Sequence, residues 1–329
     1  MKKVLFVLSV FFLFFDVSAA TKIKFGYTTN STDPRAVAAT LFESEVEKNS
    51  KGRISVELFD STKLSSLGMQ TSDTDLIESI MHKGPLDMTV SSAGNFAVYD
   101  PEIGVSALPY LFDDFESAWA FLDSDFSKAL STKMEDLNVV VLAWFTNGFR
   151  CITTTEHKIT SLADLKDLHL RTSANAVVMK TLSAFGCHAE PLDFGKLYSA
   201  LKNGRFRGQE NPIPAVYIHQ FYSVQKYLAV TNHSFDAMPL VIKKDVWEAL
   251  SSEDRAIIGT AAKNAQDLNR RIIKKQTETL LAELENQGMT ITYPNLEEFK
   301  KACKPVYDSY RTLYGEDFMA QALKLAGRK

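Results

Sequence analysis

Two spacings of apolar residues alternate along the chain. Apolar residues stand at every second position over 23–27 and again over 54–58, a spacing typical of strands. Between these stretches, apolar residues recur at helical spacing from Pro34, a residue suited to a first helical turn, to a stop at Gly52. This strand–helix–strand order predicts a parallel sheet covered by helices, so the predicted fold class is α/β.

The same two spacings continue to the end of the chain. They predict strands over residues 86–90, 139–145, 168–171, 189–192, 229–230, 240–243 and 290–292. They predict helices over residues 73–82, 116–121, 126–136, 161–167, 176–185, 194–202 and 221–228, and further helices after 296.

The longest predicted helix begins after Ser251 or Ser252 and runs to Gln287, with Gly288 as its stop. A helix of about 35 residues is near 50 Å long, which exceeds one small domain. We therefore expect it to brace two domains. A coiled-coil dimer is the alternative, but polar gaps such as Gln276 in an isolated helix argue against it.

The first 19 residues have the order of a secretory signal peptide. Lys2 and Lys3 precede an apolar run over 4–15, and Val17-Ser18-Ala19 offers small residues for cleavage after Ala19 or Ala20. An uncleaved anchor is the alternative, but the run of about a dozen residues is short of the roughly 20 that a spanning helix needs. We expect an exported, periplasmic protein.

Composition narrows the classes of function. The chain has 329 residues, enough for two domains, and its net charge of -3 provides no basic footprint for nucleic acid. Of the three cysteines, Cys151 and Cys187 pair only if their strands are neighbours, and we favour the alternative that all three, Cys303 included, are buried free thiols. The cysteines and six histidines lack metal-site spacing, and common catalytic motifs are missing, so we predict no metal, no cofactor and no enzyme.

Candidate binding chemistry gathers between residues 147 and 212. Arg150 closes the segment NGFR after the strand 139–145, and Arg171 ends the strand 168–171. Small ligands bind at the carboxyl ends of strands in open α/β sheets, and a guanidinium fits a carboxylate bidentately. We predict that the chain captures a small organic acid without chemical conversion, although spacing alone also allows a solvated surface cation at Arg171. Ser92 and Asn95, in the loop after strand 86–90, are either ligand contacts or ordinary turn residues.

A set of sequence landmarks resembles the extracytoplasmic solute-binding proteins of TRAP transporters, the DctP family. The resemblance covers about residues 22–310 and implies a periplasmic-binding-protein-like fold, with two hinged α/β domains and one long helix spanning both. The implied domains are 20–146 plus 232–271 and 147–231 plus 272–329. The landmarks are GRISVELF, ALPYLF, NGFR, LADLKDLHLR, DFGKLYSALKNG, GQENP and FYSVQKYLAVTNH.

The resemblance also implies roles for individual residues. Arg171 matches the arginine that forms the salt bridge to the ligand carboxylate, Arg150 a second ligand-facing arginine, and Asn211 of GQENP an amide that reaches the ligand. Phe194 matches an aromatic residue that packs on the ligand. Arg207 departs from the family, which commonly has Asp before GQENP, and this leaves the local pairing and the ligand's charge open.

Ser92 and Asn95 match positions that vary with the ligand. The family's sialic-acid binders resemble this chain but carry charged residues there, which disfavours sialic acid. The implied partners are membrane permease subunits of a TRAP transporter, and we expect a monomer. The alternatives are a ligand sensor that docks on a receptor, and an exported lyase or hydrolase.

Overall fold

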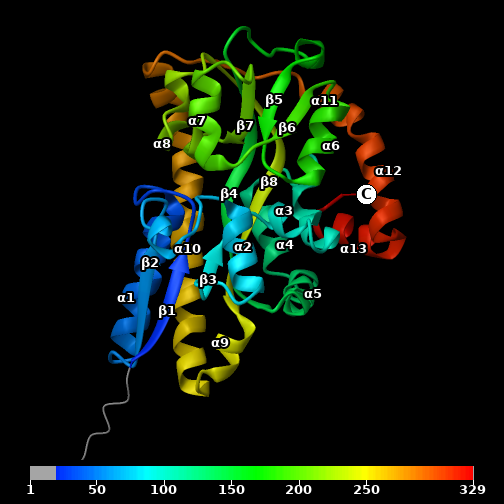
Figure 1. Ribbon diagram of the computed structural model, residues 1–329. Helices are drawn as coiled ribbons and strands as arrows, with labels where there is room; N and C mark the ends of the chain where they lie inside the picture. The colour runs from blue at the N-terminus through cyan, green and yellow to red at the C-terminus, as the bar shows by residue number, and fades with distance from the viewer. Residues whose placement is uncertain (1–19, 329) are drawn as a thin grey trace, which may run out of the picture.

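The computed structural model describes residues 20–328, so the predicted signal peptide lies outside the described residues. One mixed sheet runs through both lobes of the molecule, in the order β2-β1-β3-β8-β4-β7-β5-β6, and β9 pairs with β8 (Figure 1). The strands are β1 (Thr21–Gly26), β2 (Ile54–Phe59), β3 (Met88–Val90), β4 (Val139–Thr154), β5 (His169–Thr172), β6 (His188–Pro191), β7 (Gly208–Pro212), β8 (Tyr227–Lys243) and β9 (Thr290–Thr292).

Two long antiparallel strands, β4 and β8, join the lobes. β3 pairs with the second half of β8 in the lower lobe of Figure 1, and β7 pairs with the second half of β4 in the upper lobe. The sequence predicted separate short strands at 139–145 and 240–243, which was wrong. Bulges in the β4–β8 register, one of them between Thr146 and Gly148, interrupt the alternation of apolar and polar residues within continuous strands. Arg150 therefore lies inside a strand.

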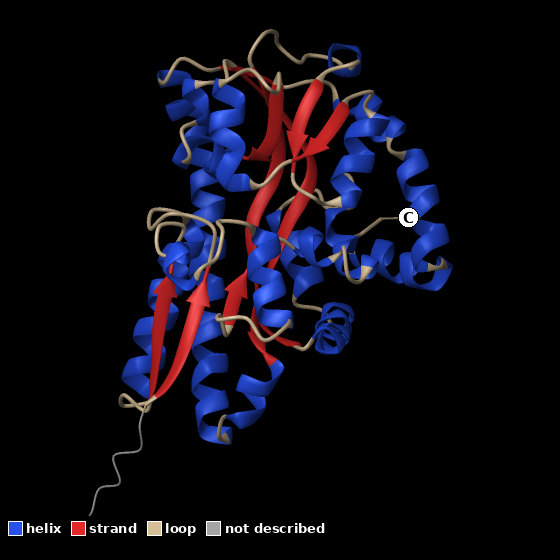
Figure 2. Cartoon of the chain, viewed as in Figure 1, coloured by secondary structure: helices blue, strands red, loops and turns tan. Residues whose placement is uncertain are grey.

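The helices cover both faces of the sheet (Figure 2). In the lower lobe, α1 and α10 pack on β1, where the rings of Phe42 and Phe25 meet edge to face with 5.9 Å between their centroids. The α-helices are α1 (Pro34–Asn49), α2 (Asp73–Met81), α3 (Ala93–Phe96), α4 (Phe115–Leu122), α5 (Asp125–Lys133), α6 (Ala176–Ala184), α7 (Phe194–Lys202), α8 (Ile213–Ile218), α9 (Lys244–Ala249), α10 (Ser252–Asn286), α11 (Leu296–Ala302), α12 (Lys304–Tyr314) and α13 (Glu316–Leu325).

Helix α10 confirms the predicted brace. Its 35 residues contact α1 and the lower lobe as well as α8 and β9 in the upper lobe. Its side chains also hold the crossing strand, because Asn269 Oδ1 accepts a hydrogen bond of 2.8 Å from the backbone N–H of Thr146. The expected α/β architecture, with one long helix spanning both parts, is therefore confirmed.

The C-terminal helices also bridge the lobes. Tyr314 donates a hydrogen bond of 2.7 Å to the carbonyl of Pro101, and Tyr307 one of 2.8 Å to the carbonyl of Pro109, both in the lower lobe. From the same segment, Ser309 accepts a hydrogen bond from Lys180 on α6 of the upper lobe. The division of the chain into two domains stays a prediction. Any hinge motion between the lobes must preserve or break these contacts.

Two further expectations concern the described residues. The three cysteines are buried free thiols, as the favoured alternative predicted, so Cys151 and Cys187 do not pair. Across residues 20–328, every helix falls short of the length and apolar character needed to cross a membrane.

Candidate functional site

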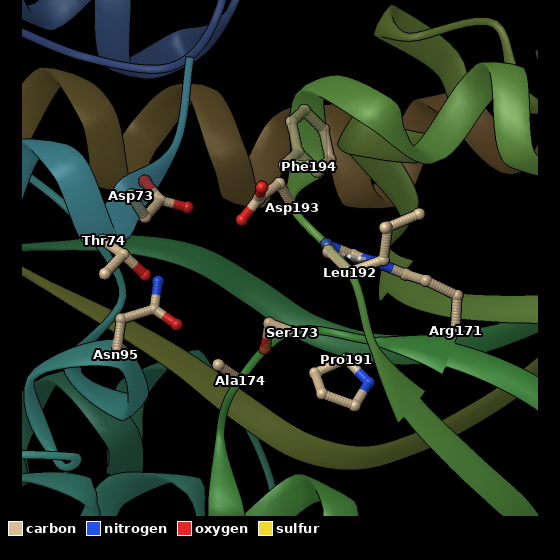
Figure 3. Close-up of a pocket in the computed structure, with 10 residues that line it drawn as sticks. All are labelled: Asp73, Thr74, Asn95, Arg171, Ser173, Ala174, Pro191, Leu192, Asp193 and Phe194. Atoms are coloured by element: carbon tan, nitrogen blue, oxygen red, sulfur yellow. Dashed lines mark hydrogen bonds between the residues drawn. The ribbon is translucent and has the colours of Figure 1, made fainter. Parts of the chain in front are cut away.

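A cavity of about 210 Å³ lies where the two lobes meet. The lower lobe contributes residues of α2 and α3, and the upper lobe contributes the end of β5, the segment after β6 and the start of α7 (Figure 3). The lining residues are Asp73, Thr74, Asn95, Arg171, Ser173, Ala174, Pro191, Leu192, Asp193 and Phe194.

Arg171 provides the cavity's cation. Strand β5 carries it beside Glu190 of β6, and the residue is only 2% exposed. Its Nε donates a hydrogen bond of 2.9 Å to the carbonyl of Leu192, and Nη2 donates to the same oxygen. Within residues 20–328, no carboxylate lies at ion-pair distance from this guanidinium, and burial lowers its pKa to about 10. The guanidinium also lies over the ring of Phe194, with Cζ of Arg171 6.0 Å from the ring centroid.

Arg150 has a different environment. Its Nη2 donates to Oε1 of Glu210 at 2.9 Å and to the Glu210 carbonyl at 2.8 Å, and its Nε donates to the same carboxylate. Its Nη1 donates to Asp236 at 2.7 Å. Burial alone would lower the pKa of Arg150, but the charges of Glu210 and Asp236 raise it above its usual range. This buried arginine is therefore paired with carboxylates of the protein itself, and it does not line the cavity.

Two more predicted residues belong to the same buried network. Asn211 accepts a hydrogen bond of 3.3 Å from Arg150 and donates one to Gln209. Ser92, predicted in a loop, is instead the N-cap of the short helix α3, and its hydroxyl donates to Asp236 at 2.7 Å. Of the six predicted site residues, the structure thus brings Arg171, Phe194 and Asn95 to the cavity, and it places Arg150, Asn211 and Ser92 outside the lining.

Asp73 and Asp193 also line the cavity, and sequence reasoning missed both. Asp73 opens α2 and Asp193 precedes α7, positions at which an acidic residue is ordinarily explained by helix capping. Asp73 accepts a hydrogen bond of 3.1 Å from the hydroxyl of Thr28, and burial raises its pKa. The signal available in the sequence was position, because α7 follows β6 directly at the end of the sheet where ligands bind.

Two contacts join the lobes beside the cavity. The hydroxyl of Ser72 donates to Asp193 at 3.4 Å, which joins α2 to α7. Gly94 of α3 packs directly against Asn175, the N-cap of α6, so closely that a Cβ on Gly94 would lie 1.9 Å from Nδ2 of Asn175. At this contact the lobes lie so close together that no space is left for a side chain at position 94.

Arg207, the departure noted in the sequence, lies away from this site. Its Nη1 forms an exposed ion pair of 2.7 Å with Glu156, and it does not line the cavity. The local pairing that the sequence left open is therefore a surface contact.

The model of the bacterial extracellular solute-binding protein family 7, DctP, matches residues 25–313. This chain belongs to the DctP family. The family comprises extracytoplasmic solute-binding proteins of TRAP transporters, which are not catalysts.

Relatives of this DctP-family chain are similar over nearly their whole length. The sialic acid-binding periplasmic protein SiaP of Vibrio cholerae is 28% identical, with 93% of each chain covered. The sugar acid binding protein of Advenella mimigardefordensis, solved in complex with galactonate, is 29% identical with a TM-score of 0.88, covering 94% of this chain and 98% of that one. A TRAP periplasmic solute-binding protein of Polaromonas, bound to D-erythronate, is 31% identical with a TM-score of 0.87, covering 92% and 98%.

Proposed function

We propose that this protein captures a small organic acid in the cavity between its lobes and delivers it to the membrane permease subunits of a TRAP transporter. Arg171 forms the salt bridge to the ligand carboxylate. The observation that carries this proposal is the state of Arg171: a nearly fully buried guanidinium, turned into a cavity, with only a backbone carbonyl as its partner among the described residues. A buried charge without a counter-charge is costly, and a ligand carboxylate supplies one.

The relatives support an acid as ligand, since the sugar acids galactonate and D-erythronate occupy two of them. Phe194 forms an apolar wall next to Arg171, and Asn95 adds an amide from the opposite lobe. Arg150, Asn211 and Ser92 stay predictions as ligand contacts. Their hydrogen bonds to Glu210, Gln209 and Asp236 favour a supporting role, in which they hold the strands behind the cavity in place.

The energetics favour closure around the ligand. A micromolar dissociation constant corresponds to about 8 kcal/mol, and a charge-assisted hydrogen bond contributes roughly 1.5–3 kcal/mol. A bidentate pair to Arg171 therefore supplies only part of the affinity, and ordering costs reduce it further. Closure of two lobes, 20–146 plus 232–271 against 147–231 plus 272–329, excludes water and strengthens each polar contact.

The proposal also includes export of the protein to the periplasm. Residues 1–19 have the order of a cleaved signal peptide, and several relatives are named as periplasmic binding proteins. We therefore place the mature protein in the periplasm, where a transporter's binding protein meets its ligand.

A thermal-shift screen of the purified protein tests this function. The panel contains monocarboxylates, dicarboxylates, keto acids and sugar acids, each measured with the wild type and with Arg171→Met. We expect at least one acid to raise the melting temperature of the wild type and to leave that of Arg171→Met unchanged. Stabilisation of both proteins alike by every active acid would contradict the role of Arg171.

A further inference from the structure

The cavity has two oppositely charged sides. Arg171 projects from the upper lobe, and Asp73 projects from α2 of the lower lobe, with the cavity between them (Figure 3). Each is left without an ion-pair partner by the part of the chain that the structure describes. The cavity therefore has an acidic side at Asp73, opposite the basic side at Arg171 where a ligand carboxylate would bind.

Two further hydrogen-bond acceptors line the cavity together with Asp73. Asp193 lies on the same cavity wall as Phe194; Lys196 pairs with one of its oxygens at 2.8 Å, and Ser72 donates to the other at 3.4 Å. Asn95 donates through its Nδ2 to the hydroxyl of Ser91 at 3.3 Å, which leaves its carbonyl oxygen for the cavity. A ligand group placed between Asp73, Asp193 and the carbonyl oxygen of Asn95 forms hydrogen bonds with them only if it brings donors.

We propose that Asp73 determines specificity by accepting hydrogen bonds from hydroxyl groups at the ligand end remote from the carboxylate, so that the site prefers a polyhydroxy monocarboxylate and rejects a dicarboxylate of equal length. This inference rests on the proposed function, because Arg171 must hold the first carboxylate. Ligand hydroxyl groups supply the hydrogen-bond donors that Asp73, Asp193 and the carbonyl oxygen of Asn95 can accept. A second carboxylate at the same place adds no donor and faces the charge of Asp73, and juxtaposed like charges weaken binding strongly.

The size of the site suits such a ligand. The cavity of about 210 Å³ adjoins a hollow of about 300 Å³, and Phe194 lines both. Pockets of a few hundred Å³ hold small molecules with most of their surface buried. An acid of four to six carbons can therefore extend from Arg171 towards Asp73.

Matched acids that differ at one carbon test the inference by calorimetry. D-Galactonate and galactarate have the same six-carbon chain, and only the second ends in two carboxylates. D-Erythronate and meso-tartrate form the corresponding four-carbon pair. With the wild type we expect the better-bound monoacid to exceed its diacid at least 100-fold in affinity. Asp73→Asn, which keeps the shape but removes the charge, narrows that ratio at least 10-fold.

Asp75→Asn is the matched control, because Asp75 lies on the same helix, does not line the cavity and, within residues 20–328, accepts a hydrogen bond only from the backbone of Gln70, at 3.2 Å. The ratio of monoacid affinity to diacid affinity in Asp75→Asn should equal that of the wild type. A diacid that binds as tightly as its monoacid, or an unchanged ratio in Asp73→Asn, overturns the inference.

The remaining outcomes separate the two proposals. If both monoacids fail to bind while succinate, pyruvate or 4-aminobutyrate binds in an Arg171-dependent way, this inference falls and the proposed function stands. If no acid of the panel binds to the wild type, the proposed function falls as well.

Discussion

Arg150 donates a hydrogen bond of 2.7 Å to Asp236, a residue 86 positions later in the chain, and both side chains are buried. Glu210 flanks the same guanidinium from β7, so Arg150 lies between two carboxylates. Arg171 carries the same charge at similar burial but is held only by the carbonyl of Leu192 among residues 20–328. The two arginines that looked alike in the sequence therefore have different physical roles.

Replacing each arginine by methionine should separate these roles. Arg150→Met leaves Glu210 and Asp236 buried without their cation, and we expect it to lower the free energy of unfolding by about 3–5 kcal/mol. Arg171→Met removes an uncompensated buried charge and frees only the Leu192 carbonyl, so its effect on stability should stay within about 1 kcal/mol. Urea unfolding of both variants measures this difference. Equal destabilisation by the two substitutions would contradict it.

Acid should weaken the fold through Glu210. Burial alone would raise its pKa, but the charge of Arg150 outweighs burial and lowers the pKa from 4.5 to about 2. A carboxyl group whose pKa is lowered by folding stabilises the fold above pH 4.5, and this contribution, on the order of 3 kcal/mol, is lost as the pH falls towards 2. Unfolding measured between pH 6 and 2 should show a shallower acid dependence for Glu210→Gln. Parallel curves for the variant and the wild type would refute the assignment.

Gly94 should be necessary for closure. A Cβ at this position would lie 1.9 Å from Nδ2 and 2.8 Å from Cβ of Asn175, which cannot easily move because its side chain accepts from the N–H groups of Val177 and Val178. We expect Gly94→Ala to hold the lobes apart, to weaken ligand binding at least 10-fold and to reduce compaction. X-ray scattering with and without saturating ligand measures the compaction.

Gly259→Ala is the control for this experiment, because a Cβ there meets nothing within 4 Å. It lies near the start of helix α10, not in α3 or α6. If Gly94→Ala shows the compaction and affinity of the control, the meeting of α3 and α6 does not limit closure.

Arg207 should be dispensable for binding. Its exposed pair with Glu156 lies outside the cavity lining, and exposed ion pairs contribute little. Arg207→Asp, which restores the residue common in the family, should change ligand affinity less than about twofold in calorimetry. A larger change would show that this position influences the ligand's charge preference.

The sequence was most informative where local chemistry decides the structure. The capping box of Ser161 and Asp164 and the alternation through Leu170 placed Arg171 at the end of a strand, which the structure confirms. The 35-residue helix followed from its cap and its spacing. Both features depend on residues close together in the chain.

Long-range pairing could not be predicted. The carboxylates that hold Arg150 come from β7 and β8, 60 and 86 residues away, and no local pattern indicates them. Polar residues in the crossing strand made β4 resemble a strand followed by a loop. Asp73 carried a signal typical of a helix start, which concealed its position in the cavity.

A crystal structure of the protein with its tightest-binding acid tests the central claim most directly. We predict a ligand carboxylate at hydrogen-bond distance from the guanidinium of Arg171, with both lobes in contact with the ligand. A carboxylate bound elsewhere, with Arg171 still bonded only to the Leu192 carbonyl, would contradict the account.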